Sequence, residues 1–279
     1  MGSTFRCWKS GTRQRRRGNC VPRSLTLSAS KLLVQNRVLA GLPRKDFRKL
    51  QSVLEPVKLD FGQVLYESQS RIRHVYFPND CFVSMLTGVD GDRSAEVGLI
   101  GSEGMIGLPV ALGIAVSPFR AVVQGGGTAM RMKIADFRRE FSESIALKRE
   151  LFLFTHLLMI QIAQTAACNR FHPVSQRMAR WMLMTSDRIK SNEFRITQEF
   201  LALMLGVRRV GVSVAASGLR ERKLMAYRRG SFTILNHRGL VAAACGCYKI
   251  VKDVYARAQG RRDLSHQRRP SHTRNRANG

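Results

Sequence analysis

Two adjacent arginines, Arg208 and Arg209, follow the corner Leu205-Gly206-Val207 and stand at the predicted start of a helix. The helix dipole already places partial positive charge there, so the arginines oppose it by a few tenths to about 1 kcal/mol. This placement becomes favourable when an anion binds, because the first backbone N–H groups also point at the ligand. Phosphates and guanine edges of DNA have the required chemistry. The pair therefore indicates contact with nucleic acid.

The flanking residues have the pattern of a helix-turn-helix. Thr197 can cap a first helix, QEFLALML, and Gly206 can adopt the positive φ at its end. In the second helix the predicted inward stripe is Val212, Ala215, Ala216 and Leu219. The residues left on or near the outer side are Arg208, Arg209, Val210, Ser213, Val214 and Ser217. An ordinary helix corner on a solvated basic face is the alternative.

A wing is predicted directly after this motif. The segment MAYRRGSFTIL has strand-like flanks around Arg229-Gly230, which is typical of a β-hairpin. Its arginines, Arg228 and Arg229, would then face the neighbouring DNA backbone. A helix-turn-helix with a wing is a more specific signal than either element alone.

The charge of the chain supports a polyanionic partner. Its 47 Lys and Arg residues against 19 Asp and Glu residues give a net charge of +28. Such an excess favours nucleic acid, with an anionic membrane surface as the weaker alternative. Part of the charge lies in Arg-rich ends, and we predict that residues 1–35 and 259–279 are a basic disordered extension and tail.

Between these ends the hydrophobic periodicity of the sequence changes twice. Residues 36–135 begin with a short helical region and continue as short alternating strands separated by turns, which predicts a compact sandwich or roll. Residues 136–172 contain neither Pro nor Gly before the helix stops at Pro173, and predict one long helix. Residues 173–258 carry the helix-turn-helix and wing. The predicted fold class is α+β.

The long helix has two apolar faces and therefore needs two partners. We expect one face to pack on the strand domain and the other to form a parallel homodimer. The stripe assigned to the dimer contact is Leu147, Leu151, Phe154 and Leu158. A monomeric core helix is the alternative. A membrane span is a second alternative, but His156, Gln161, Gln164 and Thr165 make it costly, so no membrane is expected.

The sequence from Asn36 to Tyr255 resembles the Crp/Fnr family of bacterial transcription regulators, most specifically in ITQEFLALMLGVRRVGVSVAASGL. The resemblance implies a β-roll effector domain similar to cyclic-nucleotide-binding domains, a dimerisation helix and a winged helix-turn-helix. It also implies two-fold symmetric promoter sites and contact with RNA polymerase. By the same resemblance Thr197, Gln198 and Arg208 contact phosphate and Arg209 reads guanine. Val210 and Val214 replace a frequent glutamate and a frequent basic residue, so the family's usual operator is not carried over.

Two effectors that the family uses fit this sequence poorly. Leu108 stands where cyclic-nucleotide members have a glutamate, and Arg120-Ala121 lacks the hydroxyl residue that belongs between them. A cyclic phosphate needs a fixed cation and hydrogen-bond donors. Cys7 and Cys20 alone cannot supply the four thiolates of an iron–sulfur cluster. We therefore expect neither group, and no cofactor, and leave the effector open.

The remaining candidate sites favour neither a metal nor an enzyme. Cys245 and Cys247 lie near His237, but two cysteines separated by two residues on a helix face different ways, so we expect small buried side chains and no metal. His74, His156 and His172 lack a nucleophile context, and no catalytic motif occurs. Scattered cysteines without a secretory signal predict a cytoplasmic protein. A non-specific nucleic-acid-coating protein and a cyclic-nucleotide sensor are the competing functions.

Overall fold

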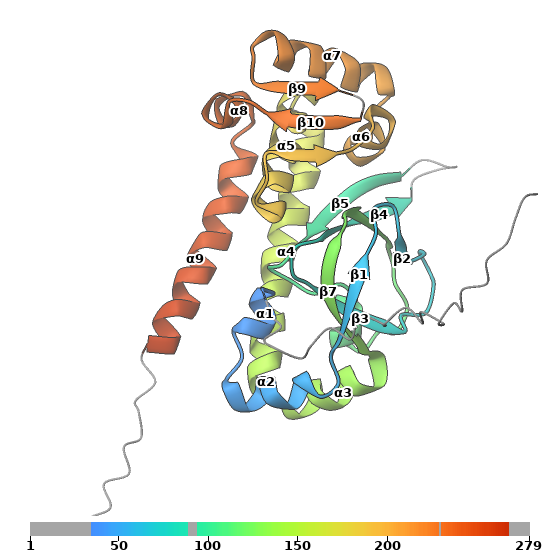
Figure 1. Cartoon of the computed structure of the whole chain (residues 1–279), viewed down its shortest axis with the longest axis vertical. Coiled ribbons are helices and arrows are strands. Elements are labelled where there is room, and N and C mark those ends of the chain that lie inside the picture. Colours follow the sequence, from blue (N-terminus) through green and yellow to red (C-terminus); the bar gives the residue numbers. More distant parts are fainter. Residues whose placement is uncertain (1–34, 89–93, 229, 268–279) are drawn as a thin grey trace, which may run out of the picture. The chain divides into compact units, whose positions relative to one another are not determined.

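The computed structural model describes residues 35–88, 94–228 and 230–267, with side chains as far as residue 260 (Figure 1). All of these residues fall within one compact unit, Val34–Gly279. Residues 1–34 of the predicted basic extension, which include Cys7 and Cys20, lie outside the described residues, and so does the wing residue Arg229. Nothing in the structure therefore bears on the predictions made for them.

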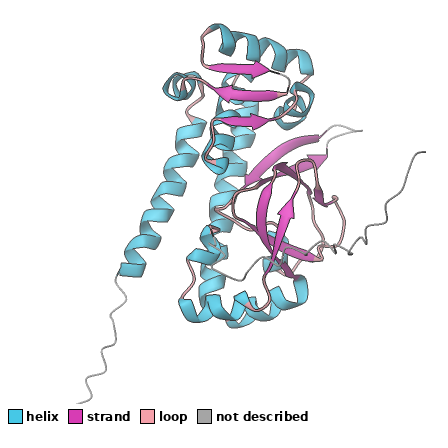
Figure 2. Ribbon diagram, in the orientation of Figure 1, coloured by secondary structure: helices cyan, strands magenta, loops and turns pink. Residues whose placement is uncertain are grey.

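The strand-rich part consists of two antiparallel sheets, as the alternating pattern predicts (Figure 2). The first sheet has the order β1-β7-β3, formed by Glu55–Leu59, Gly127–Lys133 and His74–Pro78. The second has the order β2-β6-β4-β5, formed by Val64–Tyr66, Arg120–Gly125, Phe82–Gly88 and Ser94–Ile100. A short 3₁₀ helix, Leu108–Leu112, connects β5 to β6. Together these elements form the expected β-roll.

Two short helices precede the roll, α1 (Arg37–Ala40) and α2 (Arg44–Gln51). Asn36 fixes the first of them. Its buried side chain accepts from the backbone of Val38 and Leu39 and donates to the carbonyls of Pro78 and Gly104, at 2.9 and 2.8 Å. The start of α1 is thereby attached to two loops of the roll.

The helical region after the roll is broken, so the prediction of one helix over residues 136–172 is wrong. Helix α3 covers Ile134–Glu143 and α4 covers Ile145–Phe171, with Ser144 between them in an extended conformation. The Ser144 hydroxyl accepts from the backbone N–H of Leu147 at 3.1 Å and caps α4. The serine hydroxyl offers the backbone a hydrogen bond that replaces one of the continuous helix, so the first helix ends and a second begins here. The prediction of one helix relied on the absence of Pro and Gly and did not consider a serine cap.

The face of α4 assigned to a dimer contact lies in the core of the roll, which corrects that assignment. Leu147, Leu151 and Phe154 are completely buried and Leu158 is 4% exposed within the single chain. The fit is so close that a Cβ on Gly104 would lie 2.1 Å from the Phe154 ring. Because these side chains are buried against the roll, they cannot also contact a second subunit. The apolar stripe that is most regular in the sequence is therefore the one that packs on the roll.

By length and composition α4 is the one helix of the described residues that could cross a membrane as a single segment. Its apolar character has another explanation here, since its inner face is part of the roll core. One such helix is weak support for a membrane protein.

The C-terminal part begins with α5 (Val174–Ile189), whose residues Met178, Trp181, Met182 and Leu183 are all buried. The elements that follow are β8 (Glu193–Arg195), α6 (Gln198–Leu205), α7 (Arg209–Glu221), β9 (Met225–Arg228), β10 (Ser231–Ile234), α8 (His237–Ala243) and α9 (Cys247–Gln267). Helix α9 continues past residue 258, so the predicted disordered tail over residues 259–279 is wrong for its first part, which is helical as far as Gln267.

Polar side chains connect α5 to the roll and to α4. Arg188, which is half-buried, and the buried Glu103 form an ion pair at 2.8 Å, and Arg188 also donates to Gln161 Oε1 at 2.8 Å. A second buried carboxyl, Glu96 on β5, accepts hydrogen bonds from the Ser84 hydroxyl and from Trp181 Nε1. Burial raises the pKa of Glu96 to about 7, although these hydrogen bonds oppose the shift.

Candidate nucleic-acid interface

The two helices of the motif cross as a helix-turn-helix requires. Helices α6 and α7 meet at an angle of 105°, within the range of about 90–120° for this motif. Gly206 ends α6 with a φ of 60°, in the left-handed region that favours glycine. The Thr197 hydroxyl caps the start of α6 by accepting from the Phe200 N–H at 3.1 Å. Both local predictions are confirmed.

Helix α7 packs by one face only. Its predicted inward stripe is buried, from 0% exposed at Val212 to 6% at Ala216. On the other side Val210 is 72% and Val214 69% exposed, and no side-chain hydrogen bond caps the helix at Arg208. Arg208 and Arg209 are both exposed beside the first turn. The first backbone N–H groups of α7 and two cations are therefore presented together.

Gln198 and Ser213 connect the two helices. Ser213 Oγ lies 2.8 Å from Gln198 Oε1 and 3.2 Å from the Arg209 carbonyl, and donates to one of them. The contact with Gln198 engages the amide oxygen, whereas the amide nitrogen is the atom that could donate to a phosphate. Ser213 and Ser217 are half-buried, so only part of each side chain is accessible to a ligand.

The wing forms as predicted from β9 and β10. The strands pair antiparallel with Ser231 opposite Arg228, and Gly230 has a φ of 81° in the turn. Arg228 is exposed. The structure adds a third strand, β8, which the sequence pattern did not predict. Its signal is the alternation of Phe194 and Ile196, both buried.

The roll has a cavity of about 460 Å³ lined by the β2-β6-β4-β5 sheet, the 3₁₀ helix with the loop that follows it, and α4. Leu108, Met85 and Leu158 are among its lining residues, and no charged side chain of the described residues lines it. Arg120, the only cation of the imperfect cyclic-phosphate motif, is exposed and pairs with Glu67 at 3.1 Å. The cavity lacks the fixed cation that a cyclic phosphate needs.

The reason for excluding a metal at the C-terminal cysteines is wrong. Cys245 does not lie on a helix, because α8 ends at Ala243 and α9 begins at Cys247. The histidine near these cysteines is His172 rather than the predicted His237, and Cys168 joins them. All four ligand atoms lie within 4.8 Å of one another.

Comparison with known proteins agrees with this geometry. The family model of the Crp-like helix-turn-helix domain matches residues 176–243. No match is found among curated protein sequences.

Solved structures with the same fold cover most of the described residues. FixK2 from Bradyrhizobium japonicum has 13% identity and a TM-score of 0.59, over 69% of this chain and 98% of that one. The c-di-GMP-responsive global regulator CLP from Xanthomonas campestris has 13% identity and a TM-score of 0.58, over 69% and 99%. TTHB099, a CRP-family regulator from Thermus thermophilus, has 15% identity and a TM-score of 0.57, over 67% and 96%. Residues 176–243 match the Crp-like helix-turn-helix domain, and the chain shares its fold with solved structures described as regulators of the CRP and Crp/Fnr families.

Proposed function

We propose that the protein is a sequence-specific transcription regulator that binds two-fold symmetric promoter sites as a homodimer. The geometry of α7 is the main support for this proposal. The helix crosses α6 at 105°, buries one face, and exposes Arg208 and Arg209 at its start. A helix of this kind fits the major groove, with its N-terminal residues at base edges. We assign phosphate contacts to Thr197, Gln198 and Arg208, and guanine recognition to Arg209.

The outer face of α7 also limits which bases it can read. Val210 and Val214 are its most exposed apolar residues, and they offer van der Waals contact to a thymine methyl group rather than a hydrogen bond. The operator therefore differs from one read by a glutamate and a basic residue at these positions.

A homodimer would form through the outer face of α4, not the inner face. Ile145, Phe152, Met159 and Ala166 are all exposed and recur every seven residues. With Arg149, His156, Ala163 and Arg170 they form a continuous exposed stripe with alternating steps of four and three, which is the spacing of a two-stranded coiled coil. Ala163 and Ala166 are small enough for two helices to approach closely. Pairing through this stripe would present two copies of α7 to one duplex.

The signal that the roll receives is proposed to differ from a cyclic nucleotide. The uncharged cavity and the pairing of Arg120 with Glu67 support this view. Contact with RNA polymerase and a cytoplasmic location are proposed from the family fold alone.

A salt titration of binding tests the function. We expect a selected duplex to bind more tightly than a random duplex, by a factor of about 10³ or more. Arg209→Ala should cost about 1–3 kcal/mol on the selected duplex and relax one base-pair preference, whereas Arg228→Ala should weaken both duplexes similarly. Equal affinities for selected and random duplexes would instead favour a protein that coats nucleic acid by charge alone.

A further inference from the structure

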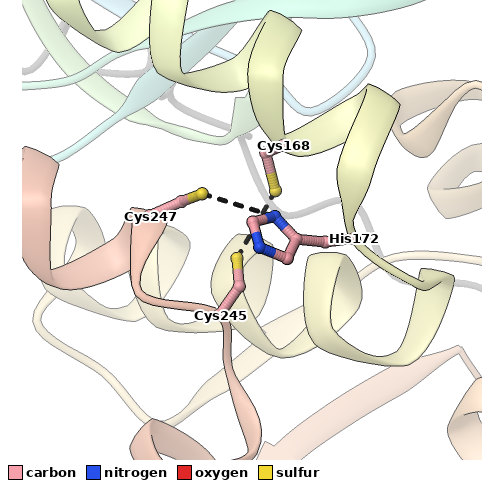
Figure 3. Close-up of side chains that lie close together, drawn as sticks. All are labelled: Cys168, His172, Cys245 and Cys247. Atoms are coloured by element: carbon pink, nitrogen blue, oxygen red, sulfur yellow. Dashed lines mark hydrogen bonds between the residues drawn. The ribbon is translucent and has the colours of Figure 1, made fainter.

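Cys168, His172, Cys245 and Cys247 converge on one point, far from the recognition helix in sequence (Figure 3). Cys168 Sγ lies 3.4 Å from Cys245 Sγ, and Cys247 Sγ lies 3.5 Å from His172 Nδ1. In a tetrahedral zinc site with Zn–S bonds of about 2.3 Å, neighbouring sulfurs are separated by about 3.8 Å. All four ligand atoms lie within 4.8 Å of one another, so small shifts of the side chains would bring them to the spacing of one tetrahedral ion.

The backbone explains why the four side chains meet. Cys168 lies in the last turn of α4, and His172 is the extended residue that follows the helix, held there by a hydrogen bond from its backbone N–H to the Cys168 carbonyl at 3.0 Å. Cys245 lies in the link between α8 and α9, and Cys247 is the first residue of α9. The chain changes direction between these two cysteines, which lets both sulfurs face α4. Three of the four ligand residues are buried, and His172 is half-buried.

The surroundings carry charge of the sign that such a site needs. Arg177 and Arg180 on α5 are 9% and 6% exposed, and within the described part of the chain neither pairs with a carboxylate. Each has an Nε atom without a hydrogen-bond partner, and the charge of each interacts with Cys168. Buried cations require a compensating negative charge. Three thiolates and a neutral imidazole around Zn²⁺ leave one net negative charge, which these arginines would offset.

The contacts of neighbouring side chains would support the ligands. Gln164 Nε2 donates to Cys247 Sγ at 3.1 Å, in the manner of hydrogen bonds that orient metal ligands. Arg180 donates to Thr165 Oγ1 at 2.8 Å, and Arg177 donates to the Leu205 carbonyl at the end of α6. The cluster is thus connected to α4, α5 and the first helix of the DNA-binding motif.

We propose that these four residues bind a single Zn²⁺ ion with Cys₃His coordination. Four protein ligands close the coordination shell, which is typical of a structural rather than a catalytic zinc site. The ion attaches the start of α9 to the end of α4 and stabilises the C-terminal domain. Binding releases the protons of the three thiols, and no oxidant or reductant is required.

Metal analysis of the full chain, purified under reducing conditions without a polyhistidine tag, tests the site. We expect about one zinc ion per chain, and replacement by Co²⁺ should give the visible absorption bands of a tetrahedral thiolate site. Cys245→Ser should lose the ion. The control Cys81→Ser, which alters a buried cysteine of the roll, should keep it.

A second pair of variants distinguishes the loss of a zinc ligand from misfolding, which could also explain a loss of zinc in Cys245→Ser. His172→Cys should retain one zinc ion because it keeps four ligands, whereas His172→Ala should bind zinc more weakly while its circular dichroism is unchanged. Protein without zinc that also fails to give tetrahedral Co²⁺ bands would overturn the proposal. So would a native Cys168–Cys245 disulfide, the absorption of an iron–sulfur cluster, or equal zinc loss in Cys245→Ser and Cys81→Ser. None of these readouts depends on DNA binding.

Discussion

Replacing Glu96 with glutamine should change how stability depends on pH. Burial raises the pKa of this carboxyl from its ordinary value of 4.5 to about 7 in the folded chain. Between these pH values the unfolded chain releases the proton and the folded chain keeps it, so the free energy of unfolding falls as the pH rises through this window. The difference of 2.5 in pKa corresponds to roughly 3 kcal/mol at pH 8.

Glu96→Gln removes this titration and keeps an oxygen that can accept from Ser84 and Trp181. We expect the variant to match the parent near pH 4.5 and to be more stable by up to about 3 kcal/mol at pH 8. Urea unfolding at fixed protein concentration, from pH 5 to pH 8.5, measures the difference. Glu221→Gln, which alters an exposed carboxyl, is the control and should leave the profile unchanged. Parallel profiles for Glu96→Gln and the parent would refute the reasoning.

Three further predictions concern the dimer, the effector and the motif. Met159→Glu on the exposed face of α4 should shift the protein toward monomer in sedimentation equilibrium, whereas Leu235→Glu at another exposed apolar site should not; an unchanged association constant would contradict the dimer stripe. Millimolar cyclic AMP or cyclic GMP should leave the melting temperature unchanged, because the roll cavity has no charged lining residue among those described, and a clear rise would reverse that conclusion. Thr197→Ala should lower the free energy of unfolding by about 1 kcal/mol through loss of the cap of α6, and a value indistinguishable from zero in chemical denaturation would show that the cap contributes nothing.

The sequence was sufficient where local chemistry determines the structure. The corner at Gly206 needs a residue that tolerates positive φ, and the stripe from Val212 to Leu219 has the period of a helix packed on one face. Both signals depend only on neighbours in the chain. The α7 helix, its exposed arginines and the wing hairpin were therefore predictable.

The sequence was insufficient where distant segments meet. The sequence of α4 shows two apolar faces but does not indicate which of them the roll covers. In the structure the face that carries Phe154 is covered, and its ring packs directly against Gly104. The cysteine and histidine cluster joins Cys168 on α4 to Cys245 in the link between α8 and α9, 77 positions later in the chain. Only the break between α8 and α9 makes Cys245 and Cys247 point together. Neither result follows from the periodicity of one segment.

Selection of bound fragments from random DNA by the purified chain tests whether α7 is a recognition helix. We expect an enriched motif with two-fold symmetry, with half-site centres about one helical turn, ~34 Å, apart. Repeating the selection with Arg209→Ala should relax one base pair in each half-site and leave the spacing unchanged. Recovery of unrelated sequences with no common motif would contradict the assignment of α7 as a recognition helix.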